Sequence, residues 1–136
     1  MKFLVDANVL SEPTKPAPQL AVVQWLREHE ADLAVDPFVI GEIRFGILLL
    51  PRGARRARLE RWFEAGVARL RCLSWDAHTG LRWAQLLAKL RASGKAMPIK
   101  DSLAAATALA YGLSVVTRNR NDFMHAGVPI VDPFRS

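Results

Sequence analysis

Short apolar segments alternate along the chain with longer segments of helical periodicity, and this alternation constrains the fold more than any other feature. Strands are expected at five short apolar segments, residues 2–5, 33–35, 72–73, 113–117 and 129–131. Between them, apolar residues recur at helical spacing, as at Val39, Ile43 and Ile47. Strands that alternate with helices build βαβ units around a parallel sheet. We therefore expect an α/β fold, a three-layer α/β/α sandwich with a parallel sheet of about five strands.

Capping residues and apolar patterns locate the expected helices. The pair Asp36-Pro37 predicts a helix start, with the aspartate as N-cap and the proline at the first helical position. Residues 59–70 carry apolar side chains at helical spacing and predict the next helix. Residues 103–110 are apolar almost all round, which is typical of a helix packed deep inside a domain.

The length and charge of the chain narrow the class of protein. A chain of 136 residues is of the size of one domain, so we take residues 1–136 as a single domain. Lys and Arg outnumber Asp and Glu by 19 to 13, which gives a formal net charge of +6. Such an excess favours a polyanionic partner such as nucleic acid, although many small basic proteins bind none.

The chain contains one cysteine, Cys72, which excludes an internal disulfide and fits a reducing compartment. The apolar run at residues 3–5 is interrupted by Asp6 and is far shorter than the core of a signal peptide. The aliphatic run at residues 47–50 is too short to span a bilayer. We expect a cytoplasmic protein that does not associate with a membrane.

Four acidic residues stand out by their positions relative to the expected elements. Asp6 directly follows the first strand, and Asp122 follows the fourth. Glu42 lies early in the helix after the second strand, and Asp101 lies at the N-terminus of the apolar helix. Groups just beyond the carboxyl ends of parallel strands line one crevice of the sheet. We therefore expect the four acids to converge, although they are far apart in the sequence.

Carboxylates that lie so close together repel one another, and some would be protonated unless a cation lay among them. Oxygen ligands suit a hard cation such as Mg²⁺ or Mn²⁺. A cation in that position would orient a phosphodiester and lower the pKa of a bound water that attacks it. The sequence therefore indicates a metal-dependent nuclease in which lysines and arginines hold the nucleic-acid backbone.

Each acid also has an ordinary structural interpretation. Asp101 would cap its helix, and Asp6 and Asp122 would be turn residues after strands. Glu42 is the most informative of the four, because it lies within a mostly hydrophobic helix. The combination of the four acids indicates a site, whereas any one of them alone does not.

Four blocks of the sequence stand in an order and at a spacing that match a known family across nearly the whole chain. They are FLVDANVL at residues 3–10, GEIRFG at 41–46, DSLAAATA at 101–108, and TRN with DF at 117–119 and 122–123. Together they resemble the PIN-domain family, and specifically the VapC-type toxins of bacterial toxin–antitoxin pairs. The individual blocks are weak signals, but four in register are a specific one.

The resemblance implies a role for each matching residue. The catalytic, metal-binding acids would be Asp6, Glu42, Asp101 and Asp122. Asn8 and Thr117 would hydrogen-bond to these acids and orient them. Asn119 stands where many relatives carry the fourth acid, which leaves open whether Asn119 or Asp122 completes the metal site.

The resemblance also implies an activity and partners. The protein would be an endoribonuclease that hydrolyses RNA phosphodiester bonds with Mg²⁺ or Mn²⁺, and it would form a homodimer or a heterotetramer with a small VapB-like antitoxin. Targets in this family are structured RNAs, often tRNA, which are cut in exposed loops. Arg44, Lys100 and Arg118 adjoin the acids in the sequence, and we expect them to contact RNA phosphates.

Two other functions stay open at this point. Asp6-Ala7-Asn8 partly matches the D-x-D motif of haloacid-dehalogenase-like phosphatases, but the second aspartate of that motif is missing. The second alternative is that the chain is a catalytically weak PIN module that acts mainly through antitoxin binding and operon repression. The intact set of four acids argues against the second alternative.

Overall fold

The computed structural model describes residues 1–135 and contains a five-stranded sheet. The strands are β1 (Phe3–Val5), β2 (Leu33–Val35), β3 (Arg71–Cys72), β4 (Ser114–Val116) and β5 (Ile130–Val131). They are ordered β3-β2-β1-β4-β5, and every neighbouring pair is parallel. The parallel five-stranded sheet expected from the sequence is confirmed.

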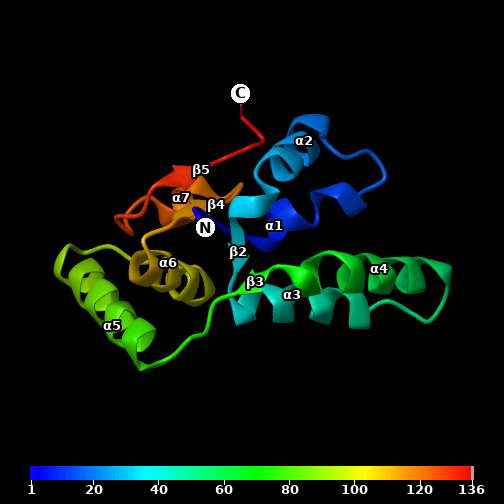
Figure 1. Cartoon of the computed structure of the whole chain (residues 1–136). Helices are drawn as coiled ribbons and strands as arrows, with labels where there is room; N and C mark the ends of the chain where they lie inside the picture. The colour runs from blue at the N-terminus through cyan, green and yellow to red at the C-terminus, as the bar shows by residue number, and fades with distance from the viewer. Residues whose placement is uncertain (136) are drawn as a thin grey trace.

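Helices connect successive strands and cover both faces of the sheet (Figure 1). The helices are α1 (Ala7–Leu10), α2 (Leu20–Glu28), α3 (Pro37–Leu48), α4 (Ala54–Ala65), α5 (Ala77–Ala92), α6 (Ile99–Tyr111) and α7 (Arg120–Phe123). Single 3₁₀ turns lie at Glu12–Thr14, Glu30–Asp32 and Val67–Arg69. Along residues 1–135, no helix is both long enough and apolar enough to cross a membrane.

Two hydrophobic cores, one on each face of the sheet, account for the three layers. Alternate residues of a strand point to opposite faces, so Val5, Val35 and Val116 pack against α1 to α4. Their neighbours in the same strands pack on the opposite face against α5, α6 and α7. Because both faces are covered at the centre of the sheet, β1 and β2 are continuous apolar runs without polar alternation.

The structure differs from the expected elements mainly at short segments. The helices α1 and α7 were not predicted, because four residues are too few to show helical periodicity. The amphipathic helix expected to include Leu59 and Leu70 is α4, which ends at Ala65, so Leu70 lies beyond the 3₁₀ turn that follows. The third strand is Arg71–Cys72, one residue earlier than expected. None of these differences moves the carboxyl edge of the sheet.

Candidate active site

The carboxyl ends of the parallel strands place acidic side chains from distant segments around one small cavity. Asp6 follows β1, Glu42 lies in the second turn of α3, and Asp101 lies in the first turn of α6. All three line the cavity, together with Asp36, Phe38, Val39, Lys100 and Ala104. Its volume is about 10 Å³, which is about the least that admits one water molecule. The structure thus brings together three of the four predicted acids around a single point.

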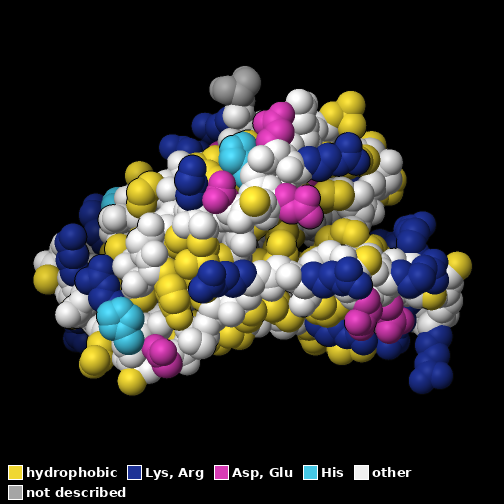
Figure 2. Space-filling model, viewed as in Figure 1, with side chains coloured by type: hydrophobic (Ala, Val, Ile, Leu, Met, Phe, Trp, Pro, Cys, Tyr) yellow, Lys and Arg dark blue, Asp and Glu magenta, His cyan; other side chains and the backbone are white. Residues whose placement is uncertain are grey.

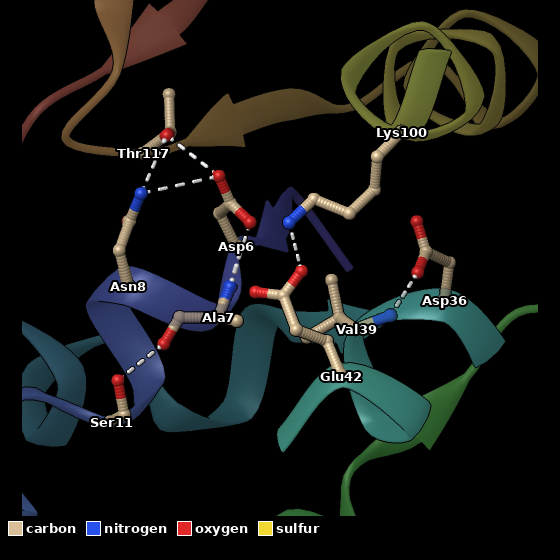
Figure 3. A network of polar contacts seen from close by, with 9 residues as sticks. All are labelled: Asp6, Ala7, Asn8, Ser11, Asp36, Val39, Glu42, Lys100 and Thr117. Atoms are coloured by element: carbon tan, nitrogen blue, oxygen red, sulfur yellow. Dashed lines mark hydrogen bonds and ion pairs between the residues drawn. The ribbon is translucent and has the colours of Figure 1, made fainter. Parts of the chain in front are cut away.

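Asp6 is held in place through both of its carboxylate oxygens (Figure 3). Its Oδ1 accepts a hydrogen bond of 2.8 Å from the backbone N–H of Ala7, which caps α1. Its Oδ2 accepts 2.8 Å and 3.4 Å hydrogen bonds from Thr117 Oγ1 and Asn8 Nδ2. Asp6 therefore has a fixed orientation, because groups from both β1's exit and β4's exit hold it.

Asn8 and Thr117 also contact one another and the backbone of the loop after β4. Asn8 Nδ2 donates to Thr117 Oγ1 at 3.4 Å, and Asn8 Oδ1 accepts from the backbone N–H of Arg118 at 3.2 Å. The backbone N–H of Asn119 donates to Thr117 Oγ1 at 3.1 Å. The network joins the start of α1 to the end of β4, so the two segments carry Asp6 as one unit.

Glu42 forms an ion pair with Lys100, and the pair spans α3 and α6 across the cavity (Figure 3). Hydrogen bonding to Glu42 raises the pKa of Lys100, and the nearby Asp6 and Asp101 raise it further. Lys100 was predicted to contact RNA phosphates. In the structure its ammonium group lies among the carboxylates and offsets part of their charge.

Burial and mutual repulsion make the acids of the cavity harder to ionise than ordinary aspartates. Burial raises the pKa of Asp101 from 3.8 to about 6, with further contributions from the negative charges of Asp6 and Asp122. Burial likewise raises the pKa of Asp6, against the opposing hydrogen bonds from Thr117 and Ala7. A bound cation would offset the cost of ionising these carboxylates and would lower their pKa values.

Asp122 and Asn119 lie at the rim of this arrangement. Asp122 is half-buried in α7 and raises the pKa of Asp101 by charge repulsion, but it is not among the residues that line the cavity. Asn119 is exposed and precedes α7 without capping it through its side chain. Asp122 is therefore the nearer candidate for a fourth acid, since its charge acts on Asp101.

The residues of the cavity fit a divalent cation in chemistry, although they do not form a ready-made metal centre. Among residues 1–135, no group of three or more His, Cys, Asp or Glu side chains is arranged to hold a metal ion. The potential ligands are carboxylate oxygens, which suit Mg²⁺ or Mn²⁺ better than softer metals. Glu42 would have to exchange its ion pair with Lys100 for the cation.

The two predicted arginine contacts have different surroundings. Arg44 donates to Glu60 of α4 at 3.4 Å, and its guanidinium lies 5.6 Å from the centre of the Phe63 ring. Arg118 is exposed at the exit of β4, and its guanidinium lies 4.7 Å from the centre of the Phe134 ring. Arg118 thus lies against Phe134 and does not line the cavity, whereas Arg44 is engaged by α4.

Asp36 is a member of the cavity that the sequence interpretation assigned only to capping. It is fully buried, and its Oδ1 accepts a 2.8 Å hydrogen bond from the backbone N–H of Val39, which makes it the N-cap of α3 as predicted. It also follows β2 directly, as Asp6 follows β1. Strand-exit position was the signal that identified Asp6, and the same signal would have identified Asp36.

Comparison with known proteins gives the family to which this arrangement belongs. The PIN domain family model matches residues 3–128. The VapC ribonuclease Y4jK of Sinorhizobium fredii is 33% identical, over 97% of this chain and 97% of that protein. The toxin FitB of Neisseria gonorrhoeae is 32% identical, over 97% of this chain and 98% of that protein.

A solved structure agrees with these sequence comparisons. The crystal structure of FitAcB from Neisseria gonorrhoeae superposes with a TM-score of 0.88 at 30% identity, covering 98% of this chain and 99% of that chain. Fold and sequence therefore agree over almost the full length of the chain. The chain belongs to the PIN-domain family, among the toxin–antitoxin PIN proteins that include VapC and FitB.

Proposed function

We propose that this protein is the toxin of a VapBC-type toxin–antitoxin pair and acts as a metal-dependent endoribonuclease. The observation that carries the proposal is that Asp6, Glu42 and Asp101, which come from three distant segments, line one cavity at the carboxyl edge of the sheet. The similarity to a protein named VapC ribonuclease and to one named toxin FitB supports the activity and the biological role.

The proposed cation ligands are Asp6, Glu42 and Asp101, with Asp122 as the fourth acid. When bound, Mg²⁺ or Mn²⁺ would orient the scissile phosphate and lower the pKa of an attacking water. Thr117 and Asn8 fix the carboxylate of Asp6 by hydrogen bonds, so that it is oriented before any ligand arrives. Asp122 adds negative charge beside Asp101 and strengthens the attraction for a cation.

The substrate proposed for this site is RNA, with a structured RNA such as tRNA as the target class. The net charge of +6 supports attraction of a polyanion. Lys100 lines the cavity with the acids, and Arg118 directly follows Thr117 at the exit of β4. Both would contact RNA phosphates, Lys100 after it separates from Glu42. Arg44 would contribute less, because Glu60 already neutralises it.

The proposed partner is a small VapB-like antitoxin, in a homodimer or a heterotetramer with it. The similarity to toxin FitB supports this assembly. An antitoxin that restrains the nuclease would explain how a cell tolerates the proposed activity. Copurification of the chain with the product of a short neighbouring gene would test the pairing.

A matched pair of glutamates tests the activity. Glu42 and Glu60 both have side chains that are 36% exposed, and both pair with a basic side chain, but only Glu42 lines the cavity. We expect Mg²⁺-dependent RNA cleavage that EDTA abolishes, a loss on the order of 100-fold in Glu42→Gln, and less than about twofold change in Glu60→Gln. Cleavage that persists in EDTA, or equal rates in the two variants, would overturn the proposal.

A second candidate function is that of a PIN module that acts mainly by binding its antitoxin. The absence of a ready-made metal group among the described residues favours it. Expression without an antitoxin separates the two functions. Growth arrest by the natural chain but not by Glu42→Gln supports the nuclease, whereas equal growth of both supports the binding module.

A further inference from the structure

Asp36 occupies the same structural position on β2 as Asp6 occupies on β1. The strands β1 and β2 are parallel neighbours, with Leu4 in register with Ala34, and each aspartate follows the last residue of its strand. Both side chains therefore emerge at one edge of the sheet, and both line the same cavity. Asp36 thus lines the same cavity as the proposed catalytic acids.

The two carboxylate oxygens of Asp36 have different surroundings. Oδ1 accepts the capping hydrogen bond from the backbone N–H of Val39. Oδ2 is completely buried, and nothing within residues 1–135 forms a hydrogen bond with it. A buried polar atom without a partner costs stability, and a charged one costs more. Helix capping accounts for Oδ1 only and leaves Oδ2 unexplained.

The N-cap of α5 shows what capping alone requires. Asp76 accepts a 3.3 Å hydrogen bond from the backbone N–H of Thr79, in the same arrangement as Asp36 and Val39. Asp76 is exposed, so its second oxygen remains in contact with water. A serine or an asparagine caps a helix about as well as an aspartate. A buried carboxylate at Asp36 therefore costs more free energy than capping of α3 requires.

The charges around the cavity indicate what would partner Oδ2. Four carboxylates line it, those of Asp6, Asp36, Glu42 and Asp101. Lys100 is the one basic side chain among the lining residues, and it pairs with Glu42. When all are ionised, four negative charges against one positive charge leave an excess of three. A divalent cation is a partner that offsets two of these three charges within so small a space.

We propose that Asp36 belongs to the cation site, where Oδ2 adds a further carboxylate oxygen to those of Asp6, Glu42 and Asp101. The assignment rests on the proposed metal-dependent function and extends it by one residue. Asp36 then has two tasks, because Oδ1 fixes the start of α3 while Oδ2 faces the cation. As α3 also carries Glu42, the cap also helps to position a second ligand, which lies about 1.7 turns further along the helix.

Substitution of the two capping aspartates by serine tests this proposal. Asp36→Ser keeps a hydroxyl that caps α3 and removes the cavity-facing charge, and Asp76→Ser is the matched control on α5. Mn²⁺ titration of the full chain, followed by calorimetry and by electron paramagnetic resonance, measures the affinity. We expect Asp36→Ser to bind Mn²⁺ about 10-fold more weakly than the natural chain, and Asp76→Ser to bind it with unchanged affinity.

Thermal unfolding provides a second measurement. In EDTA, Asp36→Ser is expected to melt at a higher temperature than the natural chain, because a buried, unpartnered charge has been removed. Added Mn²⁺ should raise its melting temperature less than that of the natural chain. Asp36→Asn, which keeps the size of the side chain, serves in place of the serine variant if that variant does not fold.

The results separate the inference from the proposed function. Equal Mn²⁺ affinities in the natural chain, Asp36→Ser and Asp36→Asn would show that Asp36 is only a cap and would overturn the inference. If the natural chain itself binds no Mn²⁺, the proposed metal-dependent function fails and the inference fails with it. A weaker affinity in both Asp36 variants, with unchanged affinity in Asp76→Ser, supports both.

Discussion

The cavity at the carboxyl edge of the sheet gathers carboxylates of which two, those of Asp36 and Asp101, are buried, whereas α4 carries arginines that remain in contact with water. Asp101 is 7% exposed and Asp36 is 0% exposed. Along α4, the arginines at positions 55, 58 and 61 are exposed, and Figure 2 shows Lys and Arg side chains spread over this part of the surface. Negative charges are thus concentrated in the cavity, where burial costs free energy. The positive charges of α4 are spread over the surface, where water solvates them.

This difference separates charges that need a functional explanation from charges that do not. Removal of a carboxylate from water costs free energy, which a folded protein tolerates where something else compensates. Exposed arginines keep a face soluble and need no partner. The cavity should therefore be sensitive to single substitutions in both activity and stability, and α4 should be insensitive in both.

The largest expected effect is at Asp6. The variant Asp6→Asn retains the oxygen that caps α1, and its amide N–H can donate to Thr117 Oγ1 in place of the bond that Oδ2 accepts, so the fold should survive. It loses the negative charge proposed to hold the cation. RNA cleavage should fall on the order of 1,000-fold, or about 4 kcal/mol of transition-state stabilisation. The control Asp76→Asn, at the cap of α5, should cleave at the natural rate; similar losses in both variants would remove Asp6 from the site.

A smaller loss is expected at Thr117, which touches Asp6 and would not touch the cation. Thr117→Val keeps the shape of the side chain but removes the hydroxyl that donates to Asp6 Oδ2 and accepts from the N–H of Asn119. Cleavage should fall about 10-fold to 100-fold, and the free energy of unfolding should fall by about 1 kcal/mol.

Thr107→Val is the matched control for this substitution. Thr107 is also fully buried, and its hydroxyl donates to the backbone carbonyl of Leu103 at 3.2 Å, away from the acids. Its variant should lose comparable stability and no activity. If the two variants lose activity equally, general destabilisation explains the effect and the orienting role of Thr117 is wrong.

The sequence predicted which residues belong to the site better than it predicted which of them contact one another. Strand exits are visible in a sequence because a buried parallel strand is an apolar run that a polar residue ends, as at Val5-Asp6. The ion pair of Glu42 with Lys100 joins residues 58 positions apart, and it depends on how α3 and α6 face each other. No local pattern encodes that relation.

Asp36 shows a second reason why sequence interpretation falls short. Its N-cap role was predicted and is confirmed by the hydrogen bond to Val39. The capping role accounts for an aspartate that precedes a proline, although Asp36 also directly follows a buried strand. The burial of its second oxygen depends on packing from α3 and α6 and becomes visible only in three dimensions.

The buried carboxylate of Asp101 should make the free energy of unfolding depend on pH, by about 1 kcal/mol, whereas exposed charges on the surface should not. Asp101 has a pKa of about 6 in the folded protein and about 3.9 in the unfolded chain. Between these values the folded state binds more protons than the unfolded state. The stability that Asp101 contributes is therefore greatest below about pH 4 and is lost as the pH rises through about 6.

Thermal melts of metal-free protein in EDTA measure this effect. Asp101→Asn cannot ionise, so it should become more stable relative to the natural chain as the pH rises from about 4 to 7, by on the order of 1 kcal/mol or roughly 3 °C. A difference in melting temperature that does not change with pH would show that Asp101 ionises as readily as an exposed aspartate.

The smallest expected effect is on α4, at Arg58. Its side chain is exposed, and Arg58→Ala should change the free energy of unfolding by less than about 0.5 kcal/mol and RNA cleavage by less than about twofold. The measurement is sharpest as a series from about 50 to 200 mM salt, since each lost phosphate contact reduces the salt dependence of binding. A tenfold loss of RNA affinity with a reduced salt slope would show that α4 binds the substrate. The arginines of α4 would then be functional in spite of their exposure, and burial would no longer separate functional charges from solvated ones in this fold.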